Sequence, residues 1–279
     1  MKNKVWFITG ASKGIGLVLA KKLLQSGYKV AATSRDMASL IKAVGAKSDH
    51  FLPLTMDLQS EGSVRAAVEA CVQTFGGLDS LVNNAGYGLF GTIEELSDEE
   101  SRENYNVNVF GLLNVLRVSL PILRKQKSGH IFNISSVGGF AGGFPGVGIY
   151  CSTKFAVAGI TEGLKAEVEP FGIKTTLVYP GYFRTNFLDS GSMVLPKNTI
   201  KAYAQARGVI EKHQNDINGQ QPGDPEKIAS ALIEVYESAK APLHLFLGSD
   251  AVQMAKSEIK IVENDIEEWL SVSTSTDFG

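Results

Sequence analysis

The sequence predicts an α/β fold, a doubly wound parallel sheet of about seven strands with helices on both faces, in a single domain of residues 1–279. Two patterns predict it. Residues 1–35 spell strand, glycine-rich turn, helix and strand, which is a βαβ unit with a right-handed parallel crossover. Short apolar runs then keep alternating with stretches of helical periodicity, as in a sheet covered by helices on both faces.

The expected elements follow one another closely from the N-terminus. Strands are expected at 5–9, 29–33, 51–56, 80–82, 130–135, 174–179 and 244–247. Helices are expected at 17–26, 63–75, 97–126, 150 to about 172, 225–238 and 257–270. Residues 182–223 break the alternation, are mixed in polarity, and are predicted to form a mobile helical lid over a substrate site. Residues 249–279 are expected to be a helical extension with a polar tail.

Composition restricts the function classes. The chain has 279 residues, 44% hydrophobic and 20% charged, with a net charge of −2, which is typical of a soluble globular protein. Near-neutral charge argues against a nucleic-acid or membrane-surface binder. Two cysteines, Cys71 and Cys151, cannot build a disulfide framework, and no Cys/His spacing predicts a metal site. With no room for a signal peptide before the first strand and no apolar run of membrane-spanning length, a cytoplasmic location is expected.

The turn between the first strand and the first helix is rich in glycine. Gly10, Gly14 and Gly16 permit a tight turn and close approach of the backbone to a pyrophosphate, beside the free N–H groups at the start of a helix. Ser12, Lys13 and Ile15 lie in the same turn. We interpret this as a dinucleotide-binding turn of a Rossmann-type fold; a plain glycine turn is the alternative.

A tyrosine and a lysine four residues apart, Tyr150 and Lys154, lie one turn apart on one helix face. A nearby ammonium lowers the pKa of a phenol and so suits it to acid/base chemistry. Ser136, at the end of the preceding strand, could grip the same carbonyl oxygen as the tyrosine. The spacing alone is weak evidence, because Tyr236 and Lys240 repeat it; that second pair is interpreted as an ordinary exposed helix face.

Several signatures occur in one order along nearly the whole chain. They are Thr9-Gly10-x-x-x-Gly14-x-Gly16, Asn83-Asn84-Ala85-Gly86, Asn108, Ser136, Tyr150-x-x-x-Lys154, and Pro180-Gly181 followed by Thr185. With these motifs the sequence resembles the short-chain dehydrogenase/reductase family. The sequences of residues 106–111 and 135–139 are similar to those of its 17β-hydroxysteroid-dehydrogenase-like branch. The resemblance implies oxidoreductase activity on CH–OH or C=O groups and a homo-dimer or homo-tetramer.

The resemblance also implies a role for each matching residue. In the catalytic set, Ser136 would orient the carbonyl, Tyr150 would be the acid/base, Lys154 would lower the tyrosine pKa and bind the nicotinamide ribose, and Asn108 would hold a water in a proton relay. In the cofactor set, Asn84, Ala85 and Gly86 would steady the central strand, Asp57 and Leu58 would meet the adenine, and Pro180, Gly181 and Thr185 would hold the nicotinamide amide.

One spacing departs from the family pattern. From Ser136 to Tyr150 is one residue more than the usual interval, and residues 137–148 could absorb the insertion as a loop bulge. Ser135 would be farther off in spacing and, by strand alternation, would face away from Ser136.

The end of the second strand favours NADP(H). An NAD enzyme of this fold places a carboxylate there for the ribose 2′-OH, whereas this chain has Ser34 followed by Arg35. A hydroxyl and a guanidinium suit a 2′-phosphate, and Lys13 could reach the same group. Asp36 is interpreted as a surface residue beyond the strand. Two solvated basic residues are the alternative.

The substrate is less constrained. Residues 137–149, 87–90 and the lid should line an apolar pocket. The resemblance to the 17β-hydroxysteroid-dehydrogenase-like branch implies steroids, retinoids or other bulky apolar carbonyls as substrates. A generic aldehyde or ketone reductase fits equally well. His130, His213 and Cys151 are expected to be structural. Two other classes remain open, a non-catalytic dinucleotide sensor and a non-redox epimerase, isomerase or lyase of the same superfamily.

Overall fold

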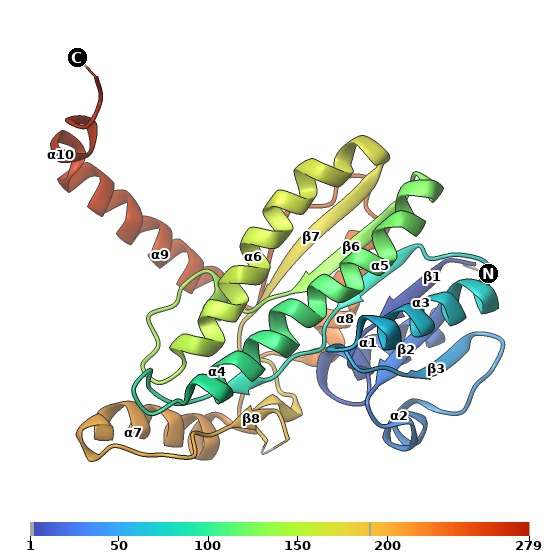
Figure 1. The fold of residues 1–279 in the computed structure, drawn as a ribbon, viewed down its shortest axis with the longest axis horizontal. Helices are drawn as coiled ribbons and strands as arrows, with labels where there is room; N and C mark the ends of the chain where they lie inside the picture. The colour runs from blue at the N-terminus through green and yellow to red at the C-terminus, as the bar shows by residue number, and fades with distance from the viewer. Residues whose placement is uncertain (1–2, 190, 279) are drawn as a thin grey trace.

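The computed structural model describes residues 3–189 and 191–278; Met1, Lys2, Ser190 and Gly279 lie outside the described residues. A seven-stranded sheet of wholly parallel pairs forms the centre, in the order β3-β2-β1-β4-β6-β7-β9 (Figure 1). Its strands are β1 (Val5–Ile8), β2 (Lys29–Ser34), β3 (Phe51–Thr55), β4 (Ser80–Asn83), β6 (Gly129–Ile134), β7 (Ile173–Pro180) and β9 (His244–Leu247). The doubly wound fold predicted from the sequence is confirmed.

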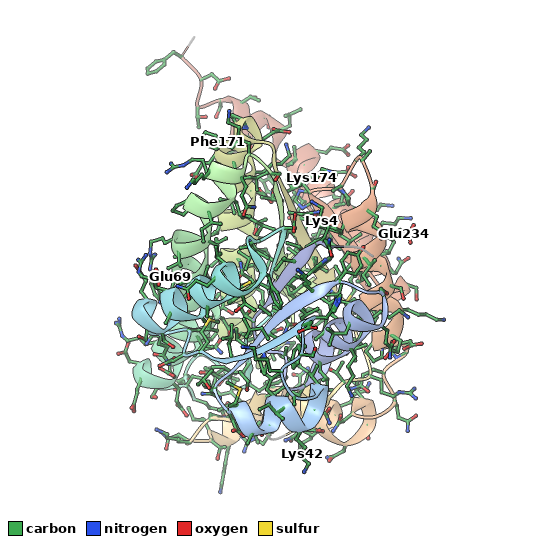
Figure 2. The ribbon with its side chains drawn as sticks, turned by 90° about the vertical axis from the view of Figure 1, so that its right-hand side faces the viewer. Lys4, Lys42, Glu69, Phe171, Lys174 and Glu234 are labelled. Atoms are coloured by element: carbon green, nitrogen blue, oxygen red, sulfur yellow. The ribbon has the colours of Figure 1, made fainter. Side chains whose placement is uncertain are left out.

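Helices cover both faces of the sheet and bury one apolar core on each. The faces follow the alternation of β1, where Val5 and Phe7 belong to one core and Trp6 and Ile8 to the other. The first core packs under α3 (Glu61–Phe75), α5 (Gly111–Gln126) and α6 (Gly148–Val168); the second packs under α1 (Gly14–Gln25), α2 (Met37–Val44) and α8 (Pro225–Glu237). In the side view, charged residues such as Lys42, Glu69 and Glu234 lie on the outer surface (Figure 2).

The long helix expected at 97–126 is two α-helices joined by a π-helical turn. α4 (Asp98–Tyr105) begins at Ser97, which forms a capping box with Glu100 as the sequence pattern indicates. Residues 106–110 form the π-helical segment η1 (Asn106–Phe110), after which α5 continues. Such a bulge inserts one extra residue per turn and often marks a functional site. Here it carries Asn108, whose side chain is buried.

The structure contains a helix that was not expected, and the C-terminal helix begins earlier than expected. α2, between β2 and β3, was not expected, and Asp36 caps its N-terminus by accepting from Ala38 N at 3.0 Å. The C-terminal helix begins at Ser249 rather than at 257, so α9 (Ser249–Glu268) starts immediately after β9. A short α10 (Leu270–Thr274) follows it.

The region expected as a helical lid is only partly helical. β8 (Met193–Val194) pairs with β5 (Gly88–Leu89) in a small second sheet, and α7 (Ala204–Lys212) continues into the π-helical turn η6 (His213–Ile217). Buried Glu95 accepts from Ile200 N at 2.8 Å, which anchors this region to the segment after β5. The lid therefore has specific attachments to the domain.

α9 leaves the domain after its first turns and projects outward with the chain end (Figure 1). Ala251 and Ala255 are buried against the domain. Large apolar side chains farther along α9 and α10 are exposed; they are Ile259, Ile261, Val262, Ile266, Trp269, Leu270 and Val272.

Among the described residues, one helical stretch, Asp98–Gln126, is long and apolar enough to cross a membrane by length and composition alone. In the sequence we found no run of that length. Slightly more than half of its most apolar window, 56%, is buried in the fold, as expected for a core helix.

Candidate active site

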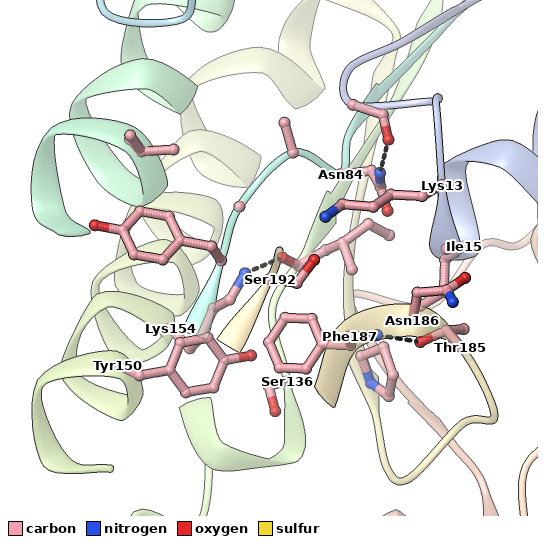
Figure 3. Close-up of a pocket in the computed structure, with 18 of the residues that line it drawn as sticks. Lys13, Ile15, Asn84, Ser136, Tyr150, Lys154, Thr185, Asn186, Phe187 and Ser192 are labelled. Carbon is pink, nitrogen blue, oxygen red and sulfur yellow. Dashed lines mark hydrogen bonds between the residues drawn. The ribbon is translucent and has the colours of Figure 1, made fainter. Parts of the chain in front are cut away.

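A cavity of about 570 Å³ opens at the carboxyl ends of the central strands. This is where doubly wound sheets bind their ligands, because the loops that follow the strands diverge there. The cavity runs from the glycine turn after β1 and the end of β2 to the start of α6 and the lid. Figure 3 shows Tyr150, Lys154 and Ser136 at one end of it and Lys13, Ile15 and Asn84 at the other.

The glycine turn is shaped for close approach of a ligand to the backbone. Gly10 and Gly14 have φ of +68° and +60°, in the left-handed region that favours glycine. A Cβ at Gly16 would lie 2.5 Å from Asn84 Nδ2 and 2.6 Å from Gly10 O. Within the described residues, Lys13 at the N-cap of α1 makes no side-chain cap, so N–H groups of the first helical turn are left for an anion.

Asn84, after β4, holds this turn in place. Its Nδ2 donates to Thr9 O at 3.0 Å and to Gly10 O at 2.9 Å. The hydroxyl oxygen of Thr9 accepts from Asn84 N and Ala85 N, each at 3.0 Å. Thr9 begins the glycine motif, but it was not among the expected site residues. The two strand ends are thereby locked to each other beside the cavity.

Tyr150 and Lys154 lie on one face of α6 and are both buried. The lysine Nζ is 5.8 Å from the centre of the tyrosine ring and donates to Ile134 O, at the end of β6, at 3.0 Å. Burial lowers the pKa of Lys154 to about 8. Ser135 donates to the backbone carbonyl of Lys154 at 2.9 Å, which fixes α6 against β6 and takes the Ser135 side chain away from Tyr150.

The pKa of Tyr150 is raised above its ordinary value, chiefly by burial. A hydrogen bond with the Ser136 side chain acts the other way and lowers the pKa by a smaller amount. We expected Lys154 to lower it. The charges that act on the Tyr150 pKa in this structure are those of Cys151 and Tyr182, which raise it, and the effect of Lys154 stays a prediction. Tyr150 is therefore a protonated hydroxyl at neutral pH, ready to donate.

The extra residue between Ser136 and Tyr150 does not keep their side chains apart, because both line the same end of the cavity (Figure 3). Ser136 also accepts from Gly138 N at 3.1 Å, which starts the short helix η2 (Val137–Gly139). The following loop, 140–147, takes up the additional length and includes Gly146 at φ +77°.

The side chain of Asn108 is hydrogen-bonded to other groups of the protein. Its Nδ2 donates to Tyr87 O at 3.0 Å and to Thr153 Oγ1 at 3.1 Å, and its Oδ1 accepts from Tyr87 N at 3.0 Å. A Cβ at Gly86 would lie 2.9 Å from that Oδ1 and 3.6 Å from Lys154 Nζ. The residue joins η1, α6 and the segment after β4, close to the lysine. Its expected role in holding a water stays a prediction.

Arg35 and Lys13 lie together at the far end of the cavity. Burial lowers the pKa of Lys13 most, and the guanidinium of Arg35 lowers it further. Lys13 Nζ also donates to Gly191 O in the lid at 2.7 Å. Asp36 lies beyond the strand end, exposed, with its carboxylate engaged in capping α2. Ser34 accepts from Asp36 N at 3.2 Å.

Asp57 and Leu58 lie on the same side of the cavity, after β3. One carboxylate oxygen of Asp57 accepts from Gln59 N at 3.0 Å. Leu58 is held by a bond from Asn114 Nδ2 to its carbonyl at 2.8 Å and packs against Gly111.

The segment after β7 carries Pro180, Gly181 and Thr185 to the cavity. Thr185 accepts from Phe187 N at 3.3 Å and caps the short helix η4 (Asn186–Leu188) (Figure 3). Asp250, in the first turn of α9, accepts from Tyr182 N at 2.7 Å, and a Cβ at Gly181 would overlap its carboxylate. The sequence did not indicate this carboxylate, because it lies some 70 residues away and α9 begins earlier than expected.

The wall beyond Tyr150 is mostly apolar, with one polar pair. Its apolar members are Phe90, Phe144, Val147, Phe187, Leu188 and Val194. His213, which we expected to be structural, also lines this cavity, with its Nε2 2.8 Å from the Tyr182 hydroxyl. Cys151 lies in the wall too, but burial raises the pKa of its thiol to about 11, which makes it a poor nucleophile.

His130 differs from His213 in its surroundings. It is buried in β6, away from the cavity, and stacks on Phe132 with the ring centroids 3.9 Å apart. Burial and the charge of Lys174 lower its pKa to about 3, so it is neutral. In the described part of the chain, no cluster of His, Cys, Asp and Glu side chains could hold a metal ion.

A family model described as short chain dehydrogenase matches residues 4–192. The chain belongs to the short-chain dehydrogenase family. It is 35% identical over 277 residues to "Oxidoreductase BOA17" of Botryotinia fuckeliana, covering 98% of this chain and 99% of that protein. It is also 35% identical over 277 residues to the "3-ketodihydrosphingosine reductase" of Bacteroides thetaiotaomicron, covering 98% of each.

Solved structures of the family agree with the fold. A short-chain dehydrogenase from Streptomyces avermitilis superposes with a TM-score of 0.88 at 35% identity, covering 98% of this chain and all of that one. A short-chain dehydrogenase/reductase from Burkholderia phymatum in complex with NAD superposes with a TM-score of 0.80 at 25% identity, covering 94% and 95%. The chain is thus an oxidoreductase-family protein along its whole length.

Proposed function

We propose that this short-chain dehydrogenase is an NADP(H)-dependent enzyme that reduces a bulky apolar ketone or aldehyde to an alcohol, or catalyses the reverse. One observation carries the proposal. Tyr150 is buried in the same cavity end as Ser136 and lies one turn from Lys154, at the wall of a largely apolar cavity (Figure 3). A hydroxyl pair beside apolar surface suits the oxygen of an apolar carbonyl.

The cavity fits a nicotinamide dinucleotide. Gly10 and Gly16 leave no room for a Cβ, and N–H groups at the start of α1 face a space fit for a pyrophosphate. Arg35, Asp57 and Leu58 would hold the adenosine part, and Pro180, Gly181 and Thr185 would hold the nicotinamide end. When bound, the cofactor supplies or accepts the hydride.

The side chains of the chain itself would manage the oxygen and the proton. Ser136 and Tyr150 would donate hydrogen bonds to the carbonyl oxygen, and these bonds strengthen as negative charge develops there. Tyr150 would then pass its proton to the alkoxide. Lys154, with a pKa near the working pH, and the neighbouring Asn108 would return a proton to the tyrosine.

Arg35 supports NADP(H) over NAD(H). Its guanidinium lies close enough to Lys13 to lower the pKa of that ammonium, and a 2′-phosphate between them would relieve this. We expect Arg35→Ala to raise the KM for NADPH about 10–100-fold, the worth of a charge-assisted hydrogen bond, with little change for NADH. Steady-state kinetics with both cofactors measure it, with the exposed Lys42→Ala on α2 as control. A wild type that prefers NADH would contradict the proposal.

The reaction class is tested by measuring the oxidation of NADPH and of NADH with a panel of apolar ketones, aldehydes and steroids. We expect turnover with NADPH for at least one bulky apolar carbonyl. One relative is named a 3-ketodihydrosphingosine reductase and matches this chain over 98% of both sequences. This name supports including long-chain ketones in that panel. A protein that binds NADPH yet reduces no carbonyl and oxidises no alcohol would favour the alternatives, a dinucleotide sensor or a non-redox epimerase, isomerase or lyase.

We further propose that the protein is a cytoplasmic homo-oligomer in which α9 contacts a second copy. Two cysteines with no disulfide between them fit a reducing compartment.

The charges along α9 bear on what covers its exposed apolar side chains. Within residues 256–268 there are five acidic side chains and two lysines, namely Glu258, Glu263, Asp265, Glu267 and Glu268, with Lys256 and Lys260. This acidic balance disfavours an anionic membrane surface as the cover for the exposed apolar side chains of α9.

Ile266 and Trp269 test the oligomer. They are 56% and 58% exposed and lie one turn apart, so a charge on each would weaken an apolar contact. We expect light scattering to give a multiple of the monomer mass for the wild type, and a smaller assembly for Ile266→Glu with Trp269→Glu. Asn264→Glu, on the polar side of α9, is the control. A monomeric wild type would overturn this proposal.

A further inference from the structure

A hydrogen-bonded polar pair lies in the mostly apolar wall of the substrate cavity. Tyr182, just after β7, and His213, at the start of η6, both line the cavity and are hydrogen-bonded to each other at 2.8 Å. Phe187, which lines the same cavity, lies beside Tyr150 (Figure 3). Polar groups in an apolar cavity select ligands, because each must find a partner when water is excluded.

The protons of this pair can be placed from the hydrogen-bond partners. His213 Nδ1 lies 2.8 Å from Val209 O, and a carbonyl oxygen can only accept, so the contact selects the tautomer with its hydrogen on Nδ1. Its Nε2 is then an acceptor, and the Tyr182 hydroxyl must donate to it. The hydroxyl proton is therefore occupied, and what Tyr182 still offers to the cavity is an acceptor lone pair.

Both side chains are held rigidly. Tyr182 N donates to the Asp250 carboxylate at 2.7 Å, and Tyr182 O accepts from Gly223 N at 2.9 Å. The His213 ring meets Phe90 edge to face, with the centroids 6.0 Å apart. A pair anchored from three sides keeps its acceptor direction, so little entropy is lost when a ligand binds to it.

The pair lies in the same cavity as the reacting position. Tyr182, His213 and Tyr150 all line it, and the charge of an ionised Tyr182 would raise the pKa of Tyr150. Cys151, next to Tyr150 in the chain, also raises the pKa of Tyr182, although burial is the main cause. A ligand group that meets Tyr182 thus lies near the carbonyl that meets Tyr150.

We propose that Tyr182 and His213 form a recognition site for a hydrogen-bond donor, a hydroxyl or an ammonium group, carried by the substrate close to the reacting carbonyl. The proposal rests on the carbonyl reduction proposed above and specifies its substrate as a bulky apolar hydroxyketone or aminoketone. An ether or a second carbonyl in that place can only accept, so it would have to take the Tyr182 proton and leave His213 Nε2 unpaired.

Three matched substrates test it: a long-chain ketone that carries an adjacent hydroxyl, its O-methyl ether, and the unsubstituted ketone. We expect wild-type kcat/KM to favour the hydroxyketone over the ether by about tenfold or more, mainly through KM. In Tyr182→Phe this ratio should fall to near one. Tyr203→Phe, which removes an exposed lid hydroxyl bonded to Glu94 outside the cavity, should keep the wild-type ratio.

A second variant separates recognition from mere packing. In His213→Leu the Tyr182 hydroxyl loses its acceptor and is free to donate, so binding of the ether should improve relative to the hydroxyketone. Loss of all three substrates in equal measure in both variants would show a structural role and overturn the proposal. So would a wild type that treats the hydroxyketone and the ether alike.

Binding alone keeps this test apart from the test of carbonyl reduction. Isothermal titration calorimetry of the same hydroxyketone and ether with the full chain needs no turnover. A donor preference in binding that Tyr182→Phe abolishes would uphold the recognition site even if no carbonyl is reduced. Equal affinity of the wild type for the two compounds would overturn it even if the enzyme turns over other ketones.

Discussion

Tyr150→Phe should lower kcat for carbonyl reduction by about 1,000-fold or more, within the range that a positioned acid/base group contributes. The substitution removes only the hydroxyl, which lies in the cavity with Ser136 (Figure 3). The ring would keep its place, because it packs in an apolar cluster with Phe187, the ring centroids 5.8 Å apart. Cofactor affinity, measured by fluorescence titration, should change little, so the loss should appear in kcat.

Tyr236→Phe is the matched control, because Tyr236 and Lys240 repeat the four-residue spacing in the sequence, although only Tyr236 lies on α8 and Lys240 follows its end. Tyr236 lies outside the cavity and packs on Trp6, with the ring centroids 4.7 Å apart. Loss of the Tyr236 hydroxyl should leave kcat for carbonyl reduction unchanged. A Tyr150→Phe enzyme with a rate close to wild type would remove this tyrosine from the chemistry.

Gly16→Ala should weaken cofactor binding about 10–100-fold and lower the free energy of unfolding by about 1–3 kcal/mol, as for overpacking at a tight contact. The added Cβ would lie 2.5 Å from Asn84 Nδ2 and 2.6 Å from Gly10 O. Neither neighbour can move freely, since Asn84 Nδ2 donates to both Thr9 O and Gly10 O. The turn must open, and the N–H groups at the start of α1 would then point away from the pyrophosphate position.

Equilibrium titration with NADPH and urea unfolding measure the two effects. Gly159→Ala in α6 is the control, because a Cβ there meets nothing within 4 Å and alanine stabilises a helix by about 1 kcal/mol relative to glycine. If Gly16→Ala bound NADPH as the wild type does, the assignment of this turn to the cofactor would be wrong. If both glycine variants lost stability equally, the contact with Asn84 would not be the cause.

Local patterns determined the sheet and its order of elements. Val5–Ile8 and Lys29–Ser34 form where apolar, β-branched runs predict buried strands, and Ser97 with Glu100 starts α4 as a capping box. These features depend on residues within one or two turns of each other, so the sequence carries them directly. For the same reason the Tyr150 and Lys154 pair on α6, and Ser136 at the end of β6, could be named before the fold was known.

Contacts between distant segments decided what the sequence could not. Asp250 meets Tyr182, and His213 enters the cavity wall, only because the ends of β7 and β9 and the lid converge at one edge of the sheet. The protonation of Tyr150 was likewise decided by the fold. Spacing predicted that Lys154 would lower its pKa, but burial raises it and lowers that of the lysine. Desolvation depends on the whole surrounding of a group, which no local spacing contains.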